Sequence, residues 1–407
     1  METTVIKEEF LNQALVLARG AEVLPGGINE LALKLQKSKE ENKPLRIKLG
    51  MDPSRPDLHL GHTVVLRKIK QFQDLGHKIV LIVGGGTGMI GDPSGKSDTR
   101  PSLTKEQVEE NAKTYFEQIS KVIDVNKAEI VNNADWLYKL NFIEMLKLAS
   151  KVTVAQIMTR DDFAKRYAEN RPISVHEFFY PLMQAYDSVV VDADIELGGT
   201  DQRFNNLLGR EIQSAYGKEH PQMVMLLPLL EGTDGVVKMS KSFPEHCISL
   251  TDSAKDMYGK LMSISDNLIL KYFSLLTEVS NAELKQIEEQ MKTSNPRDIK
   301  MKLAYTITEM YNGEVAAKEA EQNFIKVVQN KEIPDDIPAV KLNEDISLID
   351  FISNFDKTLS RSDIKRLASS GALKINSEKQ SNPNFMITKN MLPVIIQYGK
   401  RKYIKGE

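Results

Sequence analysis

Residues 45–83 read LRIKLGMDPSRPDLHLGHTVVLRKIKQFQDLGHKIVLIV and contain the pattern that decides the fold. Leu45–Leu49 has the length and apolar character of a short strand, and Lys78–Val83 is a run rich in β-branched residues. Between them, Gly61–Leu75 carries apolar residues at helical spacing, and Gly76 is typical of the residue at which a helix ends. The stretch therefore predicts a strand, a helix and a second strand, which is the repeating unit of an α/β fold.

Two later apolar runs extend this pattern. Val189–Val191 and Met223–Leu230 are each followed within a few residues by a turn that contains glycine, so we expect strands there as well. The simplest arrangement is a Rossmann-like, doubly wound parallel sheet covered by helices. Ligand-binding groups of such a sheet gather where its strands end.

Length and composition limit the class of protein. A chain of 407 residues exceeds the usual size of one hydrophobic core, so we expect two or three domains. With 41% hydrophobic and 27% charged residues, no apolar run long enough for a membrane span and a polar, acidic start, the sequence predicts a cytoplasmic globular protein with no membrane contact. The single cysteine, Cys247, and six unclustered histidines predict neither a disulfide nor a zinc site.

Charge is distributed unevenly along the chain. Residues 357–407 hold 11 Lys and Arg against 3 Asp and Glu, a net charge of +8, while the whole chain carries −2 and the remainder therefore −10. A basic end on an acidic body indicates a polyanionic partner that is held at that end.

The second half of the chain predicts two further units. From Thr251 to about Asn330 the pattern is helical, and Asn295-Pro296 before an amphipathic run is typical of a helix start. Pro334 and Pro338 indicate a linker, after which the last 65 or so residues read as a small α+β unit. The predicted domain boundaries are 1–247 for the sheet domain, 248–335 for the helical domain and 342–407 for the C-terminal unit.

A glycine-rich segment, residues 84–97 (GGGTGMIGDPSGKS), follows the second predicted strand. Gly86, Gly88 and Gly91 fit the spacing of a dinucleotide-binding turn, but that motif needs a helix at the glycines, and the following Asp-Pro-Ser-Gly reads as a turn. The phosphate-binding P-loop fails by one residue, because only three residues separate Gly91 from Gly95. A tight turn without a ligand remains an alternative for this segment alone.

His59, Gly61 and His62 stand at the start of the first predicted helix. The backbone N–H groups and the dipole of a helix start favour phosphate, and two imidazoles can donate hydrogen bonds to phosphate and ribose oxygens. Gly61 has no side chain to keep a nucleotide away. A metal pair and an ordinary surface pair are the alternatives, and the metal reading lacks an evident third ligand.

Residues 238–242 (KMSKS) follow the turn formed by residues 232–235 (GTDG). Two lysines three residues apart on a mobile loop can approach a triphosphate and neutralise the charge that develops on a leaving pyrophosphate. Taken alone, such a segment is more often a solvated basic loop.

A third group of polar residues lies between these segments. Tyr180, Gln184 and Asp187 are spaced so that, on a helix, they share one face and can line one side of a pocket. The alternative is an amphipathic helix whose polar residues merely border the core. Gly199, Asp201 and the neighbouring Gln202 follow in the run GGTDQ.

The order and spacing of these motifs resemble the paired signatures of class I aminoacyl-tRNA synthetases, and the intervening residues resemble the tyrosyl-tRNA synthetases in particular. The resemblance extends over nearly the whole chain. It implies that tyrosine is joined to ATP as tyrosyl-adenylate, that the tyrosyl group is then moved to tRNA-Tyr, and that Mg²⁺ accompanies ATP while no zinc is needed. It also implies a homodimer. The residues that it implies are His59, His62, Lys238 and Lys241 for catalysis; Gly50, Asp52, Ser54, Gly61, Lys96, Arg100, Gly199 and Asp201 for ATP; and Lys48, Asp92, Tyr180, Gln184, Asp187 and Gln202 for tyrosine.

Lys48 departs from the best-known form of the family, in which a tyrosine shares the contact with the substrate phenol. The surrounding residues resemble a second bacterial branch that usually has lysine there. The resemblance assigns the phenol contact to Asp187, and how Lys48 shares it stays open. The tryptophan-specific sister enzyme is an alternative, although that enzyme normally lacks the C-terminal unit.

In that unit, residues 359–376 resemble the small RNA-binding module named after ribosomal protein S-four. A helix there would place basic side chains where they can follow RNA phosphates, and the next strand would add another. The predicted tRNA-binding residues are Arg361, Lys365, Arg366 and Lys374. Two rival hypotheses remain, a synthetase-like RNA-binding protein without catalysis and a nucleotidyltransferase that does not act on tRNA.

Overall fold

The computed structural model describes residues 5–51, 57–90, 114–329, 337–399 and 402–407. These residues form two compact units, Met1–Gly313 and Glu314–Glu407, and each unit is described by itself. None of the helices in the described ranges combines the length and the apolarity that a membrane span requires.

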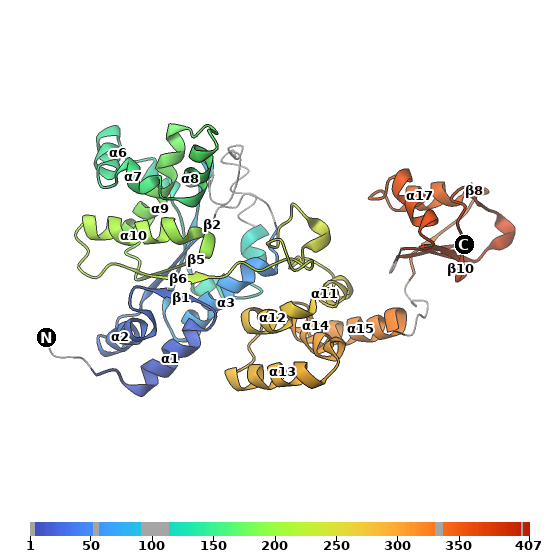
Figure 1. Cartoon of the computed structure of the whole chain (residues 1–407), viewed down its shortest axis with the longest axis horizontal. Coiled ribbons are helices and arrows are strands. Elements are labelled where there is room, and N and C mark those ends of the chain that lie inside the picture. Colours follow the sequence, from blue (N-terminus) through green and yellow to red (C-terminus); the bar gives the residue numbers. More distant parts are fainter. Residues whose placement is uncertain (1–4, 52–56, 91–113, 330–336, 400–401) are drawn as a thin grey trace. The chain divides into compact units, whose positions relative to one another are not determined.

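A six-stranded sheet forms the centre of the first unit (Figure 1). Its strand order is β1-β6-β5-β2-β3-β4, and all neighbours are parallel except the edge strand β1, which is antiparallel to β6. The predicted doubly wound parallel sheet is therefore confirmed. Its strands are β1 Glu22–Leu24, β2 Arg46–Met51, β3 Lys78–Val83, β4 Glu129–Asn132, β5 Ile195–Gly199 and β6 Met223–Leu227.

Helices cover both faces of this sheet, as Figure 1 shows, with α9 and α10 on one side and α1 and α3 on the other. The sheet is buried because its strands are almost continuously apolar: every residue of β6 is buried, as are five of the six in β3. The helices around the sheet are α1 Glu8–Ala18, α2 Gly27–Glu40, α3 Leu60–Asp74, α9 Phe179–Val190 and α10 Arg203–Ala215. Four shorter helices precede α9, namely α5 Ala134–Leu137, α6 Phe142–Ala149, α7 Val154–Ile157 and α8 Asp161–Ala168.

The strand–helix–strand prediction for residues 45–83 is confirmed in β2, α3 and β3, and Gly76 adopts the left-handed backbone with φ of 84°. The expectation of a strand at Val189–Val191 is wrong, because these residues end α9. The strand begins instead at Ile195. Its second residue is the buried Glu196, and this charge inside a buried strand hid the apolar pattern.

Four further helices complete the first unit, and the predicted helix start at Asn295 is confirmed. The Asn295 side chain accepts a hydrogen bond from Arg297 N, and Pro296 occupies the first helical position. The helix ends at Gly313, which has φ of 85°. These helices are α11 Ala254–Leu261, α12 Ile269–Leu276, α13 Asn281–Thr293 and α14 Pro296–Asn312.

The second unit begins with α15 Glu314–Phe324 and continues into a small α+β fold around its own core. A five-stranded sheet of order β10-β9-β12-β13-β7 packs with α16 Leu348–Phe355 and α17 Arg361–Ser369 around apolar side chains such as Ile352, Ile364 and Ile396. Gly371, in the turn between α17 and the following strand, has the left-handed backbone with φ of 71°. The strands are β7 Ala339–Val340, β9 Leu373–Ile375, β10 Glu378–Lys379, β12 Val394–Tyr398 and β13 Tyr403–Gly406, and β8 Ile346–Ser347 pairs separately with β11 Met386–Ile387.

Candidate active site

A pocket of about 280 Å³ opens at the carboxyl ends of β2, β3 and β5, where the topology of an open parallel sheet predicts a ligand site. It brings together residues from segments far apart in the sequence. Several predicted site residues line it, namely Gly50, His62, Tyr180, Gln184, Asp187, Gly199 and Gln202.

Asp187 is a buried carboxyl group in the wall of this pocket. Its Oδ1 accepts a hydrogen bond of 2.8 Å from Trp136 Nε1, and its Oδ2 accepts one of 3.1 Å from Asn133 Nδ2. Burial raises the pKa of Asp187 to about 7, against the opposing effects of Lys48 and of the two hydrogen bonds. A carboxylate has about four acceptor positions, so Asp187 can accept a further hydrogen bond from a ligand in the pocket.

Asn133 and Trp136 were not predicted from the sequence. They follow β4, and Asn133 also accepts a hydrogen bond of 2.8 Å from Gly86 N and donates one of 3.1 Å to Thr87 Oγ1. Asn133 thereby fixes the glycine turn after β3 against the Asp187 carboxylate. Its position after a strand of the sheet was the available signal, but the weak strand β4 could not be recognised from its sequence.

Lys48 lies behind the pocket rather than in its lining, and its side chain is 0% exposed. Its Nζ donates to Gln184 O at 3.0 Å and to Ser188 Oγ at 2.7 Å, and it forms an ion pair of 2.9 Å with Glu196 Oε1. The structure therefore places Lys48 close to the substrate-facing helix α9 without bringing it to the pocket surface. Glu196 is a second residue that sequence reasoning missed.

A network of amides connects Gln184 to the start of α10. Asn205 Nδ2 donates to Gln184 Oε1 at 3.1 Å and to Gln202 Oε1 at 3.0 Å, and Gln184 Nε2 donates to Asn206 Oδ1 at 3.1 Å. Within the described ranges, Asn206 Nδ2 is buried without a hydrogen-bond partner, and Asn206 lines the pocket. An unpaired buried donor is costly, so this atom is suited to a polar ligand group.

His59 and His62 are held by the backbone at the start of α3. His59 Nδ1 accepts a hydrogen bond of 3.1 Å from Gly61 N, and His62 Nδ1 accepts one of 3.2 Å from His59 N. Since each Nδ1 accepts, the neutral rings carry their proton on Nε2 and can donate from there. The rings are neutral because burial lowers the pKa of His59 to about 2 and that of His62 to about 4; His62 and Lys238 lower the former further.

The predicted lysine loop is anchored to the first unit at both ends. Met239 is buried and its N–H donates to Leu230 O at 2.7 Å, while Leu60 N donates to Ile248 O at 3.0 Å and joins the following segment to the start of α3. Lys238 Nζ lies 3.6 Å from Asp201 Oδ2, and Lys241 Nζ lies 2.8 Å from Asp57 Oδ2. The loop thus holds two cations beside carboxylates that flank the two histidines.

Three glycines border this site, and they differ in the space that lies beside them. A Cβ on Gly61 would meet the His59 ring at 2.9 Å, and a Cβ on Gly199 would meet Asp201 Oδ1 at 2.5 Å. Within the part of the chain that the structure describes, a Cβ on Gly50 would meet no atom within 4 Å, so Gly50 borders open space in the pocket. Gly61 and Gly199 therefore serve the packing of protein groups, whereas the space at Gly50 is available to a ligand.

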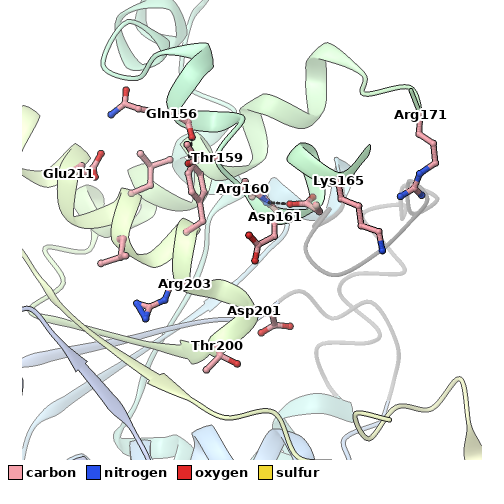
Figure 2. A pocket seen from close by; sticks show the side chains of 14 residues that line it. Gln156, Thr159, Arg160, Asp161, Lys165, Arg171, Thr200, Asp201, Arg203 and Glu211 are labelled. Atoms are coloured by element: carbon pink, nitrogen blue, oxygen red, sulfur yellow. Dashed lines mark hydrogen bonds and ion pairs between the residues drawn. The ribbon is translucent and has the colours of Figure 1, made fainter. Parts of the chain in front are cut away.

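A second, larger cavity of about 890 Å³ lies beside this pocket (Figure 2). Figure 2 shows Arg160 and Asp161 on one side of it and Thr200 and Asp201 on the other. Arg160 is buried and donates to Asp162 Oδ1 at 2.7 Å and to Asn205 Oδ1 at 3.2 Å, so it joins this cavity to the amide network of the smaller pocket. The cations and carboxylates that line the cavity are balanced in number, namely Arg160, Lys165, Arg171 and Arg203 against Asp161, Asp162, Asp201 and Glu211.

Five predicted site residues lie outside the described residues, namely Asp52, Ser54, Asp92, Lys96 and Arg100. Residues 91–97 of the glycine-rich segment and Pro334 of the predicted linker also lie outside the described residues. Within the ranges that the structure describes, no group of three or more His, Cys, Asp or Glu side chains could hold a metal ion.

The predicted RNA-contacting residues lie on neighbouring elements of the second unit. Arg361, Lys365 and Arg366 belong to α17, and Lys374 belongs to β9. Arg361 forms an ion pair of 2.7 Å with Asp350, and Arg366 pairs with Asp363 in the first turn of its own helix. The helix therefore carries a basic, largely exposed surface.

Comparison with known proteins identifies the family of this chain. The family model of class I tRNA synthetases (W and Y) matches residues 39–329. The chain is 49% identical to the tyrosine–tRNA ligase of Carboxydothermus hydrogenoformans over 98% of both chains, and 51% identical to that of Thermotoga maritima over 91% of this chain and 92% of the relative.

Solved structures support the fold independently. The C-terminally truncated mitochondrial tyrosyl-tRNA synthetase of Aspergillus nidulans has a TM-score of 0.63 at 21% identity, over 78% of this chain and 93% of that one. The enzyme from Archaeoglobus fulgidus, complexed with L-tyrosine, has a TM-score of 0.61 at 23% identity, over 77% and 99%. The fold and site are those of a class I aminoacyl-tRNA synthetase of the tryptophan and tyrosine group. Within that group, the chain belongs to the tyrosine–tRNA ligases, and the predicted resemblance is confirmed.

Proposed function

We propose that the pocket at the carboxyl ends of β2, β3 and β5 binds L-tyrosine and activates it with ATP, before the tyrosyl group is transferred to tRNA-Tyr. The observation that carries this proposal is the Asp187 carboxylate, which is buried, held by two donors and still able to accept a hydrogen bond. A phenol O–H is the donor that tyrosine offers there. Phenylalanine would leave this buried carboxylate unpaired, and the general tyrosyl-enzyme example of such rejection is about 10⁵-fold.

The other end of tyrosine would lie against the polar wall of the pocket. Tyr180 and Gln184, together with Asp92 outside the described residues, are proposed to hold the ammonium group. Gln202 would face the carboxylate, and the unpaired Asn206 Nδ2 is a further donor suited to it. These contacts would hold the carboxylate of the bound tyrosine, which is itself the nucleophile that attacks the α-phosphorus of ATP. The first step therefore needs no general base and depends on positioning.

ATP is proposed to occupy the space bordered by Gly50 and the start of α3. The Nε2–H groups of His59 and His62 would donate to the nucleotide, and Lys238 and Lys241 would neutralise the charge that develops on pyrophosphate. Gly61, Gly199 and Asp201 complete the described part of this site. Asp52, Ser54, Lys96 and Arg100 are proposed for the same role on the basis of the family resemblance.

We expect Mg²⁺ to enter with ATP. The phosphate oxygens would hold most of its coordination sphere, because Mg²⁺ keeps several waters and needs only one or two carboxylates. The partly exposed carboxylate of Asp201, 3.6 Å from Lys238, fits such a single contact. When bound, the ion would neutralise phosphate charge during the transfer.

The remaining parts of the chain are proposed to bind tRNA. Residues 1–247 would form the catalytic domain, residues 248–335 would help to position the anticodon region, and residues 342–407 would form the S-four-like module. The net charge of +8 over residues 357–407 supports a polyanionic partner. Arg361, Lys365, Arg366 and Lys374 would contact RNA phosphates.

A homodimer is the proposed active form. Large apolar side chains are exposed on α6, α7, α8 and the turn at Val175–Phe178. Several exposed apolar side chains on neighbouring segments of the sequence are typical of an interaction surface, whereas single ones are common on any protein. The exposed side chains are those of Phe142, Ile143, Leu146, Val154, Tyr167 and Val175. Burial of this surface against a second copy would remove it from water. We further propose a cytoplasmic location, where ATP and tRNA are available.

The test is tyrosine-dependent exchange of pyrophosphate into ATP by the purified chain, measured with each amino acid separately. Exchange with tyrosine alone is expected, and Asp187→Asn should reduce the preference for tyrosine over phenylalanine by several orders of magnitude. Exchange with tryptophan instead would overturn the proposed substrate. Exchange with no amino acid would support the non-catalytic RNA-binding hypothesis.

A further inference from the structure

Three charged side chains from three different elements meet at the base of the tyrosine pocket. Lys48 comes from β2, Asp187 from α9 and Glu196 from β5, and all three are buried. Of these three, the proposed binding of tyrosine uses only Asp187 directly. The ion pair of Lys48 and Glu196, with its side chains 0% and 2% exposed, therefore needs an account of its own.

The hydrogen bonds of Lys48 leave no donor for a substrate. An ammonium group has three N–H bonds, and Lys48 Nζ has three acceptors within 3.0 Å: Gln184 O, Ser188 Oγ and Glu196 Oε1. A direct contact with the substrate phenol would require the loss of one of these bonds in a buried position, which is costly.

Glu196 is held just as fully. Its Oε1 also accepts from Gln184 Nε2 at 3.4 Å, and its Oε2 accepts from Ser188 Oγ at 3.2 Å and from Gln222 Nε2. The pair thus holds Gln184 from two directions, Lys48 through its carbonyl and Glu196 through its side-chain amide. Gln184 and Asp187 lie on the same face of α9, so the pair fixes the helix face that meets the substrate.

We propose that Lys48 and Glu196 are positioning residues that orient the tyrosine-binding face of α9 and set the charge around Asp187, so that recognition of the substrate hydroxyl depends on an ion pair whose own hydrogen bonds are made within the protein. This inference rests on the proposed role of Asp187 in binding the phenol.

The electrostatic part of the argument depends on all groups that face Asp187. Lys48 on β2 favours its ionised form and Glu196 on β5 opposes it, while Asn133 and Trp136 donate hydrogen bonds to it. The other titratable groups in the pocket lining are His62 from α3, Tyr115 from residues 114–119, and Tyr180 from α9 itself. Burial keeps His62 neutral by lowering its pKa to about 4. Lys48 is therefore the positive charge that most favours the ionised form of Asp187.

The two partners of the ion pair therefore act on Asp187 with opposite sign. Burial already raises the pKa of Asp187 to about 7, close to physiological pH. Removal of the Lys48 charge would raise the pKa of Asp187 further, and removal of the Glu196 charge would lower it. If the pair only supported the fold and did not act on the charge of Asp187, the two single variants would not shift the pKa of Asp187 in opposite directions.

The test compares Lys48→Met, Glu196→Gln and the double variant in tyrosine-dependent pyrophosphate exchange between pH 6 and 9. The readout is the pH at which the KM for tyrosine changes, since tyrosine needs ionised Asp187 as its acceptor. We expect this midpoint to rise by about one pH unit in Lys48→Met and to fall in Glu196→Gln. The KM for phenylalanine, which has no hydroxyl to pair with the carboxylate, should rise rather than fall as Asp187 ionises, so its change with pH should have the opposite sign.

The double variant tests whether folding confounds the result. It replaces a buried ion pair by two neutral side chains, a change that proteins often tolerate. The pH midpoint should still rise, but by less than in Lys48→Met, because Lys48 has a larger effect on Asp187 than Glu196 has. Glu177→Gln is the matched control, because Glu177 forms another buried ion pair, with Arg166 at 2.5 Å, outside the pocket lining. This control should lower the melting temperature without moving the midpoint.

The outcomes separate this inference from the proposed function. Wild-type protein without tyrosine-dependent exchange would overturn the proposed function itself. Normal wild-type exchange with midpoints that stay fixed, or that move in the same direction in both single variants, would overturn the positioning role of the pair.

Discussion

Lys241 Nζ lies 2.8 Å from Asp57 Oδ2, and this contact joins the lysine loop to the chain just before α3. The second lysine of the loop, Lys238, lies near Asp201. Both lysines that are proposed to act on pyrophosphate are thus paired with carboxylates in the ligand-free protein. ATP must compete with these carboxylates when it binds.

Asp57→Asn should therefore strengthen ATP binding. Without the carboxylate, Lys241 is available to the triphosphate, and we expect the KM for ATP in pyrophosphate exchange to fall about threefold at low salt and less at high salt. Protein stability should change by less than about 1 kcal/mol, because the Asp57 side chain is about half exposed and its ion pair is screened by solvent. Asp74→Asn is the control, since Asp74 pairs at 2.7 Å with Lys70 on the exposed side of α3. A higher KM in Asp57→Asn would instead make Asp57 a group that positions the loop for catalysis.

The two histidines should remain neutral throughout the physiological range. Burial lowers the pKa of His59 to about 2 and that of His62 to about 4, whereas an unfolded imidazole titrates near about 6.5. Below about pH 6.5 the unfolded state takes up protons that the folded state does not, so this contribution makes stability fall as pH falls, and it disappears above about pH 7. NMR of the ring protons should show no titration of either histidine between about pH 5.5 and 8.

His77→Gln provides the comparison for that experiment. His77 also has a pKa lowered to about 4 by burial, but it lies outside the pocket and accepts a hydrogen bond from Leu45 N. This variant should lose part of the pH dependence of the free energy of unfolding while pyrophosphate exchange stays unchanged. Titration of His59 or His62 near pH 6.5 would contradict the geometry that fixes their tautomers.

The sequence predicted the elements that follow regular patterns. Residues 45–83 showed their strand, helix and strand because apolar spacing and Gly76 are local signals, and the helical spacing of Tyr180, Gln184 and Asp187 placed them together on α9. The pattern failed at β5, because the buried Glu196 interrupts the apolar run that would have identified this strand. The short apolar run Val189–Val191 predicted a strand, but it ends α9.

The groups that support Asp187 could not be predicted for a different reason. Asn133 and Trp136, three residues apart at the start of α5, donate hydrogen bonds to it, and Glu196 on β5 acts on it through its charge. No spacing in the sequence relates these two elements to Asp187. Lys48 was predicted as part of the tyrosine site, but only the folded chain brings it against Ser188 and Glu196. Local motifs thus identified the residues proposed to meet the ligands, and tertiary structure was needed to identify the residues behind them.

Gly50→Ala tests the open space in the pocket. A methyl group there would meet no atom of the described residues within 4 Å, so the melting temperature should stay within about 1 °C of wild type. The same methyl group would occupy the space proposed for ATP, and we expect the KM for ATP to rise about tenfold. Gly85→Ala is the contrasting variant, because its Cβ would lie 2.2 Å from Asn132 Oδ1 and should destabilise the fold. A normal KM for ATP in Gly50→Ala would exclude the nucleotide from this part of the pocket.

Lys365→Gln combined with Lys374→Gln tests the basic surface of the second unit. Both lysines lie on adjacent elements of that unit, whereas Arg361 and Arg366 already pair with aspartates. If Lys365 and Lys374 contact RNA phosphates, the KM for tRNA should rise about tenfold, and its dependence on salt should weaken by about 0.7 to 0.9 per lysine on a double logarithmic scale. Pyrophosphate exchange should not change, because it requires no tRNA.

Net charge alone could weaken tRNA binding, so the experiment needs a lysine far from this surface in the sequence. Lys7→Gln is suitable, since the side chain of Lys7 is exposed and pairs with Glu40 in the first unit. An equal salt dependence for Lys7→Gln and for either C-terminal lysine variant would mean that tRNA responds to the overall field of the protein. A weaker salt dependence in the C-terminal variants alone would require local phosphate contacts, because counterion release follows the number of contacts made and not the charge of the whole molecule.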